Sequence, residues 1–249
     1  MLGVVVALPS EARAIMGRRG WRREDDFKFA CRSTRWGPKL LCVRSGIGAN
    51  RAERAARWLV GRGAEALGVF GVSGGLNPVL EFGATVIADT ILSADRTGAT
   101  GRWVADPEFA DSFFHESASK KLPVFRGPIA TTKHPVFSRE EKKRLFHMTG
   151  AFAVDLESAA VARVAAGENL PFLAVRTICD CAADDLPAEL YGLLDARGIL
   201  CGRILMTLLW RHPGYAVEMV RYGRRFSKAL KSLRAAFKIF EKNPLKNFQ

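Results

Sequence analysis

Short apolar segments rich in β-branched residues alternate with helical patterns along most of this chain. Such alternation is typical of a mostly parallel or mixed sheet covered by helices. We therefore predict an α/β fold, namely a single domain with a central twisted mixed β-sheet flanked by helices. Residues 92–128 are less regular. The expected strands cover residues 3–8, 39–44, 66–70, 85–88, 152–154 and 172–179, and the expected helices cover residues 10–17, 50–62, 155–166 and 190–210.

The length of 249 residues suits one large α/β domain with a full core. We assign residues 1–210 to this domain and residues 211–249 to a C-terminal extension. No uncharged apolar run reaches the roughly 18 residues of a transmembrane helix, so none is expected. The first eight residues lack the basic leader of a secretory signal, which favours a cytoplasmic protein.

Cysteine usage argues against both a disulfide framework and a metal site. The five cysteines are scattered and odd in number, as is usual for reduced cytosolic thiols. Cys179 and Cys181 are the only close pair, and neither a second pair nor a histidine lies nearby. We therefore expect no bound metal.

Three acidic residues lie where an expected strand passes into a helix or ends. Glu11 follows the first strand, Glu157 opens a helix, and Asp180 ends an apolar strand that also carries Arg176. Burying an arginine and a carboxylate in such a strand is costly unless both have partners. In open α/β sheets ligands bind beyond the carboxyl ends of the strands, so these side chains are expected to share one site.

A glycine-rich segment, Gly71–Gly75, falls at the same edge of the expected sheet. Glycines there could let the backbone approach a ligand closely. The segment lacks the spacing of a dinucleotide-binding fingerprint and the Lys-Ser/Thr of a P-loop. By itself it is best explained as a tight turn.

Five segments in a fixed order resemble the nucleoside phosphorylase/nucleosidase superfamily, and most of all the methylthioadenosine/S-adenosylhomocysteine nucleosidases. The resemblance covers residues 1–210, which would form a catalytic domain of that kind. The segments that carry it are Gly3–Glu11, Ser45–Gly48, Gly71–Leu76 followed by Phe82–Val86, Val154–Ala162 and Arg176–Asp180.

The resemblance implies cleavage of an N-glycosidic bond through an oxocarbenium-like ribosyl cation. Asp180 would bind adenine and supply the proton on N7, for which its pKa must be raised. Glu157 would accept hydrogen bonds from the ribose hydroxyls. Glu11, with Arg176 and Ser45, would position and deprotonate water. The other substrate-binding residues that the resemblance implies are Val72, Ser73, Gly74, Val136 and Leu156, and no cofactor is required.

Each of these residues also has a purely structural explanation. Glu11 lies in the first turn of a helix after Pro9, where the helix dipole favours an acid. Glu157 shares that explanation, and Asp155 beside it could cap the helix. Arg176 could form a structural ion pair with either acid. The four histidines form no close-spaced motif, and we expect them in loops or at the surface.

The sequence departs from the family pattern at positions that bear on the chemistry. Cys179 stands where a serine usually precedes the catalytic aspartate, and Leu156 replaces the usual methionine. Phosphorylases of the family carry a Gly-Asp-Pro-x-Arg loop after the first strand, whereas this chain has Leu8–Glu11 there. A glutamate would repel incoming phosphate, so hydrolysis is favoured. Phosphorolysis with inorganic phosphate stays the alternative, because Arg13 and Arg44 could supply positive charge for an anion.

The C-terminal segment is strongly basic. Residues 211–249 hold ten Lys/Arg against two acids, within a net charge of +13 for the whole chain. Phe226, Leu230, Leu233, Phe237 and Phe240 recur at helical spacing, so residues 222–242 form a basic amphipathic helix. Its apolar stripe could pack on the protein's own core, on a partner subunit of a homo-oligomer, or on an anionic membrane. Nucleic acid is disfavoured, because the aromatic residues do not alternate with the cations.

Asp184–Pro187, together with the basic helix, resembles a subgroup called the hopanoid-associated phosphorylases. That resemblance implies adenosylhopane, a lipid-linked adenosine, as the substrate, and peripheral association with the inner face of the membrane. Methylthioadenosine and S-adenosylhomocysteine are the alternative substrates. A non-catalytic nucleoside-binding protein is the alternative of another class.

Overall fold

Four parallel strands form the part of the sheet that was most evident from the sequence. In the computed structural model, residues 1–33, 39–186, 195 and 215–242 are described. Strand β1 (Leu2–Val6) pairs in parallel with β4 (Leu40–Arg44) and with β5 (Ala66–Gly75), and β5 pairs in parallel with β10 (Phe172–Asp180). Their runs of Val, Leu and Ile are almost wholly buried, as expected for strands covered on both faces.

The remaining strands make the sheet mixed and close part of it into a ring. Strand β10 is antiparallel to β6 (Thr85–Asp95), and β6 is parallel to β8 (Val124–Thr131). Strand β9 (Ala153–Asp155) is parallel to β8 and antiparallel to β5, which completes the ring. Antiparallel strands β2 (Arg22–Glu24), β3 (Phe27–Arg32) and β7 (Gly98–Val104) extend its edges. The predicted mixed sheet with flanking helices is confirmed.

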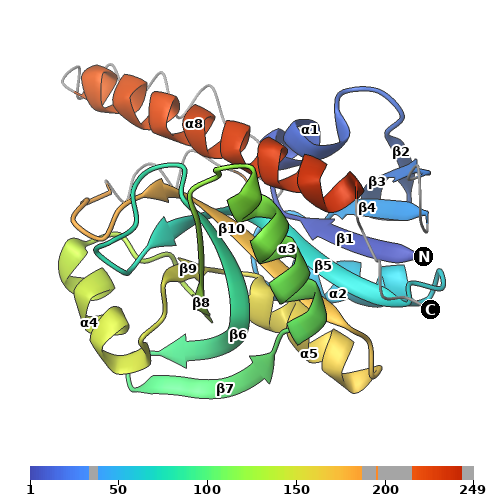
Figure 1. The fold of residues 1–249 in the computed structure, drawn as a ribbon, viewed down its shortest axis with the longest axis horizontal. Coiled ribbons are helices and arrows are strands. Elements are labelled where there is room, and N and C mark those ends of the chain that lie inside the picture. The colour runs from blue at the N-terminus through green and yellow to red at the C-terminus, as the bar shows by residue number, and fades with distance from the viewer. Residues whose placement is uncertain (34–38, 187–194, 196–214, 243–249) are drawn as a thin grey trace.

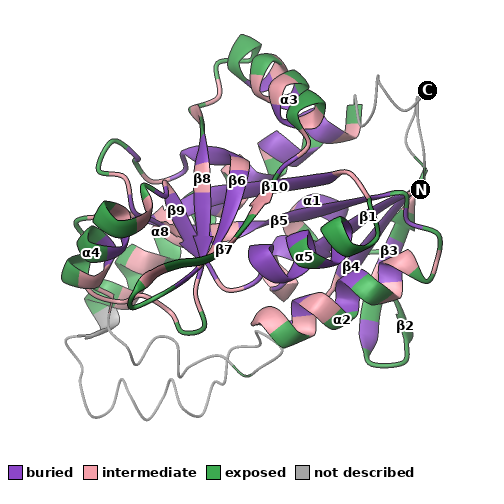
Figure 2. Ribbon diagram, turned by 90° about the horizontal axis from the view of Figure 1, so that it is seen from below, coloured by how far each residue is buried: buried purple, intermediate pink, exposed green. Residues whose placement is uncertain are grey.

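Helices cover both faces of the sheet (Figures 1 and 2). On one face, α2 (Ala49–Val60) and α5 (Ser158–Gly167) pack on each other and on the strands. On the other face, α1 (Pro9–Met16), α3 (Pro107–Ser119) and α8 (Tyr215–Lys242) enclose a second core. Helix α4 (Arg139–Thr149) lies at the edge near β9.

The C-terminal helix α8 packs its apolar stripe on the protein's own core. Leu233, Phe237 and Phe240 are buried, and the Phe70 ring of β5 meets the Phe237 ring edge-on at 5.1 Å. The stripe was expected to pack on the protein's own core, on a partner subunit or on a membrane. The structure shows it packed on the protein's own sheet. The predicted domain boundary after residue 210 and the predicted helix 190–210 lie outside the described residues.

Two local expectations were wrong. Residues 92–128, expected to be less regular, contain β7, α3 and the first part of β8. Gly71–Gly75 continues strand β5 and is not a tight turn. The glycines are needed because other side chains cross this strand closely: a Cβ on Gly71 would lie 2.7 Å from Glu11 Oε1. Among the described helices, none is both long and apolar enough to cross a membrane.

Candidate active site

A cavity of about 270 Å³ opens beyond the carboxyl ends of β1, β5, β9 and β10. Parallel strands end at the same edge of a sheet, so residues far apart in sequence meet there. The described wall includes four acids and no lysine or arginine. These acids are Glu11, Asp155, Glu157 and Asp180. The three acids that were predicted to share a site thus face one cavity.

Glu11 is held by backbone N–H groups at the start of α1. Its Oε2 accepts hydrogen bonds from the amides of Ala7 (3.0 Å) and Leu8 (2.8 Å), and its Oε1 accepts one from Val72 (2.9 Å). The bond to Leu8 satisfies the backbone N–H of the N-cap residue of α1, so the structural role expected for this acid is present as well. Burial raises the pKa of Glu11, while the Arg176 charge and these amides oppose the rise.

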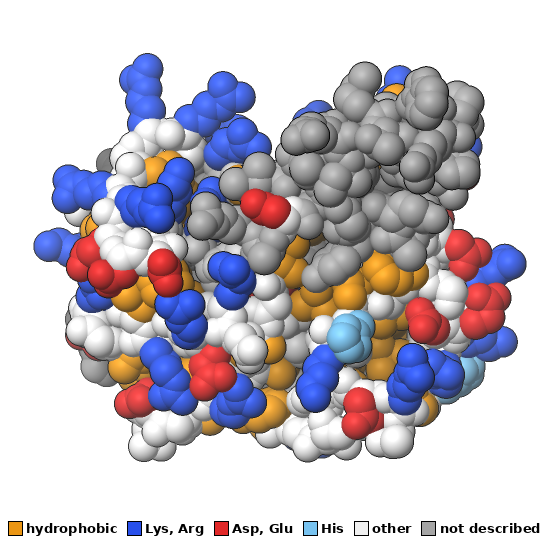
Figure 3. Space-filling view, turned by 180° about the vertical axis from the view of Figure 1, so that it is seen from behind, with side chains coloured by type: hydrophobic (Ala, Val, Ile, Leu, Met, Phe, Trp, Pro, Cys, Tyr) orange, Lys and Arg blue, Asp and Glu red, His pale blue; other side chains and the backbone are white. Residues whose placement is uncertain are grey.

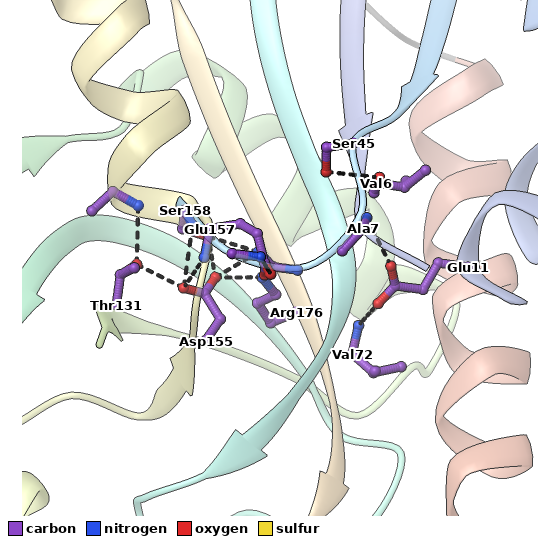
Figure 4. A network of polar contacts seen from close by, with 12 residues as sticks. Val6, Ala7, Glu11, Ser45, Val72, Thr131, Asp155, Glu157, Ser158 and Arg176 are labelled. Atoms are coloured by element: carbon purple, nitrogen blue, oxygen red, sulfur yellow. Dashed lines mark hydrogen bonds and ion pairs between the residues drawn. The ribbon is translucent and has the colours of Figure 1, made fainter. Parts of the chain in front are cut away.

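Arg176 and Asp155 form a buried ion pair behind the cavity wall (Figure 4). Arg176 Nε donates to Asp155 Oδ2 at 2.7 Å, and Arg176 Nη2 donates to Ser158 Oγ at 3.1 Å. Asp155 Oδ1 also accepts from the Thr131 hydroxyl at 2.6 Å and from the amides of Glu157 and Ser158. Asp155 therefore caps the start of α5 and also neutralises the arginine.

Glu157 lies at the junction of β9 and α5. It has fewer hydrogen bonds and ion pairs than Asp155 to offset the cost of its burial. Its Oε1 accepts a hydrogen bond from the Gly48 amide at 2.9 Å, and its Oε2 is 3.6 Å from Arg176 Nη2. Burial raises the pKa of Glu157 to about 7, against the opposing charge of Arg176. One arginine thus faces Asp155, Glu157 and Glu11, which leaves an excess of acidic groups at this end of the cavity.

Asp180 ends β10 and is bound by a residue that the sequence pattern did not single out. Lys142 of α4 donates to Asp180 Oδ2 at 2.5 Å, and both side chains are buried. Cys179 Sγ lies 3.2 Å from Asp180 Oδ1, so the thiol occupies the place of the expected serine hydroxyl. Burial raises the pKa of Asp180, and Lys142 opposes that rise. A Cβ on Gly74 would be 3.1 Å from Asp180 Oδ2, which explains a glycine there.

The other predicted site residues divide into two groups. Arg176 lies behind the wall, and the Ser45 hydroxyl is directed at the carbonyls of Val6 (3.3 Å) and Gly46 (2.7 Å). The remaining ones line the cavity, namely Val72, Ser73, Gly74, Val136 and Leu156. The Ser73 hydroxyl is buried and has no hydrogen-bond partner among the described residues, which leaves it for a ligand.

Sequence reasoning missed Lys142 and several apolar wall residues. Lys142 lies in the run Arg139–Arg144, which has the composition of a solvated helix face. The only signal is its spacing of three from Leu145, because these two residues are the buried positions of α4. The missed apolar wall residues include Leu8, Ile47, Phe137 and Leu186. In the described part of the chain, no group of three or more His, Cys, Asp or Glu side chains is arranged to hold a metal.

Comparison with known sequences identifies a family and named relatives. A family model described as "Phosphorylase superfamily" matches residues 2–196. A 5′-methylthioadenosine/S-adenosylhomocysteine nucleosidase of Mycobacterium bovis is 24% identical over 206 residues, which are 69% of this chain and 81% of that protein. The nucleosidase of the same name from Thermotoga maritima is 30% identical over 148 residues, 58% of this chain and 67% of that protein.

Solved structures share the fold. The nucleosidase of the same type from Helicobacter pylori, crystallised with butyl-thio-DADMe-Immucillin-A, superposes with a TM-score of 0.72 at 17% identity. The match covers 96% of this chain and 95% of the other, so it includes the C-terminal region.

Proposed function

Because this chain belongs to the phosphorylase superfamily, we propose that it cleaves the N-glycosidic bond of a 5′-modified adenosine and releases adenine. The observation that carries the proposal is the cavity wall, where four acids and no described lysine or arginine face the ligand space. The two sequence relatives are both named as nucleosidases of 5′-modified adenosines, which supports the same substrate class.

The acidic end of the cavity suits a ribosyl cation. Breaking the bond between C1′ and N9 leaves its electron pair on the base and positive charge on the sugar. Glu157 accepts hydrogen bonds from the ribose hydroxyls, and these strengthen as the sugar becomes cationic. Arg176 acts from behind the wall by holding Asp155 and facing Glu157. The excess of acids over this one arginine stabilises the transition state more than the neutral nucleoside.

Glu11 and Asp180 take the two proton transfers. Water attacks C1′ and gives a proton to Glu11, and Asp180 gives a proton to N7 of the departing adenine. Solvent then carries the proton from Glu11 back to Asp180, and the sum of the steps is the nucleoside plus water giving free adenine and the 5′-modified ribose. Asp180 and Ser73 both reach the cavity from neighbouring strands, so both can contact the base.

Hydrolysis fits the site better than phosphorolysis. A phosphate ion beside C1′ would face Glu11 and Glu157, and the nearest described arginine already binds Asp155. The test is adenine release in phosphate-free buffer. A rate that does not change when phosphate is added supports hydrolysis, and a strict requirement for phosphate would show that the enzyme is a phosphorylase. The proposed reaction needs no cofactor.

The favoured substrate is adenosylhopane, which would yield adenine and ribosylhopane in hopanoid lipid biosynthesis. Its support is the apolar part of the wall, because Leu8, Ile47, Phe137 and Leu186 offer a hydrocarbon-like surface to a 5′ substituent. Methylthioadenosine and S-adenosylhomocysteine are the alternatives. Relative kcat/KM for the three compounds decides among them, and a preference for S-adenosylhomocysteine would contradict the lipid substrate.

An enzyme that acts on a lipid substrate would gain from binding an anionic membrane. The outer face of α8 is suited to such binding. The exposed residues of this face are mostly cations. They are Arg221, Arg224, Lys228, Lys231, Arg234, Lys238 and Lys242. Elsewhere, on the surface seen in Figure 3, cationic and acidic side chains lie side by side. Each cation near an anionic bilayer contributes about 1 kcal/mol. The proposed location is the cytoplasm, at the inner face of the membrane.

Two further expectations accompany the proposal. The chain is expected to form a homo-oligomer, which light scattering of the purified protein measures. The alternative of another class, a nucleoside-binding protein without catalysis, predicts tight adenosine binding and no adenine release. The three acids Glu11, Glu157 and Asp180 at one cavity argue against it, since binding alone does not require acids placed for two proton transfers.

A further inference from the structure

Lys142 is the one fully buried lysine among the described residues, and it points at the base-binding acid. It lies in the first turn of α4, which a Ser138 capping box holds in place. Its Nζ is 2.5 Å from Asp180 Oδ2, 3.0 Å from the Cys181 carbonyl oxygen and 3.0 Å from the Asp184 carbonyl oxygen.

These three acceptors use all the hydrogens of an ammonium group. A buried cation without such partners would be very unfavourable, so these acceptors offset the cost of burying Lys142 and fix its position. The cation also ties α4 to the segment that follows β10, where Leu186 contributes to the cavity wall. Lys142 therefore sets both the place and the electrostatic surroundings of Asp180.

We propose that Lys142 is a positioning residue that acts through Asp180 to assist the departure of the base. The inference rests on the proposed function, in which Asp180 gives its proton to N7. When that proton moves, Asp180 becomes a carboxylate, and the ammonium group already bonded to Oδ2 stabilises the charge that forms. Lys142 thereby makes Asp180 a stronger acid towards the leaving adenine.

The two ends of the cavity then have opposite electrostatic character. The ribose end has Glu11, Asp155 and Glu157 around Arg176, which favours the sugar cation. The base end has Lys142 against Asp180, which favours the negative charge that builds on the base.

Other titratable groups also lie near Asp180, on β10, on the segment after it and on α8. They are Cys179, Cys181, Asp184, Tyr222 and Arg225.

Together, these neighbours do not cancel the effect of the Lys142 charge on the Asp180 carboxyl group. The Asp184 carboxylate is paired with Arg225 at 2.9 Å, so it opposes Lys142 only weakly. The Cys179 thiol is buried beside Asp180, and its pKa is raised well above the ordinary value by burial and by that acid, so it remains a neutral donor. Lys142 is therefore the cation in direct contact with the Asp180 carboxyl group.

The first test measures Asp180 directly and needs no catalysis. The full-length protein is labelled with ¹³C at aspartate carboxyl groups, and the Asp180 signal is identified by its loss in Asp180→Asn. Replacing Lys142 by Met removes the cation, and we expect the Asp180 midpoint to rise by about 1–3 pH units. Lys143→Met, at an exposed lysine of the same helix, is the matched control and leaves the midpoint unchanged.

The second test asks whether the role of Lys142 depends on the leaving base. Single-turnover release is compared for 5′-methylthioadenosine and for its analogue with fluorine on the purine ring, whose base leaves more readily. We expect the rate loss in Lys142→Met to be about tenfold larger for adenine than for the fluorinated base, since general-acid assistance matters less for the better leaving group. Lys142→Arg keeps the cation and restores much of the adenine rate.

The outcomes separate this inference from the proposed function. Equal rate losses for the two bases, or an Asp180 midpoint that does not move, overturn the role of Lys142 even in an active enzyme. If the unmodified protein releases neither base, and no adenine from adenosylhopane or S-adenosylhomocysteine, the proposed function is wrong, and the titration alone decides whether Lys142 controls the protonation of Asp180. If Lys142→Met does not fold, Lys142→Gln supplies the neutral comparison for both tests.

Discussion

Arg176 Nε donates a 2.7 Å hydrogen bond to Asp155 Oδ2, and both side chains are almost completely buried. This pair places a positive charge directly behind Glu11 and Glu157, the other two carboxyl groups at the ribose end of the cavity. The arginine is thus engaged before any substrate arrives, and Glu157, at 3.6 Å, receives only part of its field.

Removing that arginine is expected to destabilise the fold strongly. Arg176→Met leaves buried carboxylates without their partner, which corresponds to a loss of about 3–5 kcal/mol in the free energy of unfolding. The loss should be smaller in acid, where the orphaned carboxylates take up protons. Urea unfolding across pH measures both effects. Arg163→Met breaks an exposed ion pair with Glu53 and should change stability by less than about 1 kcal/mol; comparable losses in the two variants would contradict the buried-pair interpretation.

Glu157 is expected to favour substrate binding and, when ionised, to lower the free energy of unfolding. Its folded pKa of about 7 lies above its ordinary value, so the folded protein retains a proton that the unfolded chain releases. The group therefore contributes most to stability below its unfolded pKa, and that contribution is lost as pH rises towards 7.

Glu157→Gln should accordingly raise the free energy of unfolding above pH 7, on the order of 1–3 kcal/mol, and abolish adenine release. The amide keeps an oxygen that can accept from the Gly48 amide, so the packing is preserved. Thermal melts on either side of pH 7 measure the gain. A variant that is less stable than the parent at alkaline pH would show that the carboxylate is not strained.

Asp180→Asn is expected to lose most of its turnover while retaining ligand affinity. The amide cannot give a proton to N7, and general-acid assistance contributes about 10²–10⁴-fold to rate. Measuring kcat and adenine affinity separately distinguishes lost chemistry from lost binding. Cys179→Ser is the matched comparison, because a hydroxyl replaces the thiol 3.2 Å from the same carboxyl group, and it should stay active. Undiminished adenine release by Asp180→Asn would refute the mechanism.

Gly71 is expected to tolerate no side chain, because of its neighbours and not because of its backbone angles. A methyl group there would lie 2.7 Å from Glu11 Oε1 and would also collide with the Arg176 guanidinium. Gly71→Ala should lower stability by about 1–3 kcal/mol and reduce turnover. Gly61→Ala is the control: a Cβ there meets no atom closer than 3.5 Å, so stability should hold or rise by about 0.4–1 kcal/mol.

Membrane contact is best tested by neutralising the outer face of α8. Deleting residues 222–249 would also remove Leu233, Phe237 and Phe240 from the core, so a deletion cannot isolate lipid binding. The combined Lys231→Gln, Arg234→Gln and Lys238→Gln variant should weaken binding to anionic vesicles by about 3 kcal/mol at most. Its turnover of methylthioadenosine should not change, because these side chains lie away from the described cavity wall.

The control for this experiment neutralises exposed cations elsewhere. Lys120, Lys121 and Lys143 are exposed and lie outside α8, so their replacement by Gln removes the same charge from other surfaces. Sedimentation with vesicles of neutral lipid reports binding that does not depend on charge. Equal loss of vesicle binding in both triple variants would mean that net charge, and not the face of α8, attracts the protein.

Local pattern was sufficient for the elements whose residues have a strong periodicity. The apolar runs of β1, β4, β5 and β10 predicted buried strands, and the spacing of Ala52, Ala55, Ala56 and Leu59 predicted α2. The prediction for residues 92–128 was wrong because the strands there lie partly at the surface. Their apolar residues follow neither a helical nor a strand period. The β7 residues alternate between exposed and half-buried, and α3 has only three buried positions.

The location of the candidate site follows from the sequence, but its ion pairs do not. Acids after strands converge because parallel strands end at one edge, and that rule is enough to predict that Glu11, Glu157 and Asp180 share a site. Which cation meets which acid depends on how separate elements pack. The partner of Asp180 lies 38 residues earlier, in a helix whose composition is typical of a solvated one.

The amino-acid sequence by itself determined the α/β architecture, the edge of the sheet where acids gather, and the amphipathic character of α8. These properties follow from periodicity and from chain direction, which neighbouring residues specify locally. Only the tertiary structure decided that α8 packs on its own sheet, that Arg176 pairs with Asp155, and that Lys142 is buried against Asp180. Such pairings depend on distances between elements and on the cost of burying charge, which exist only once the chain has folded.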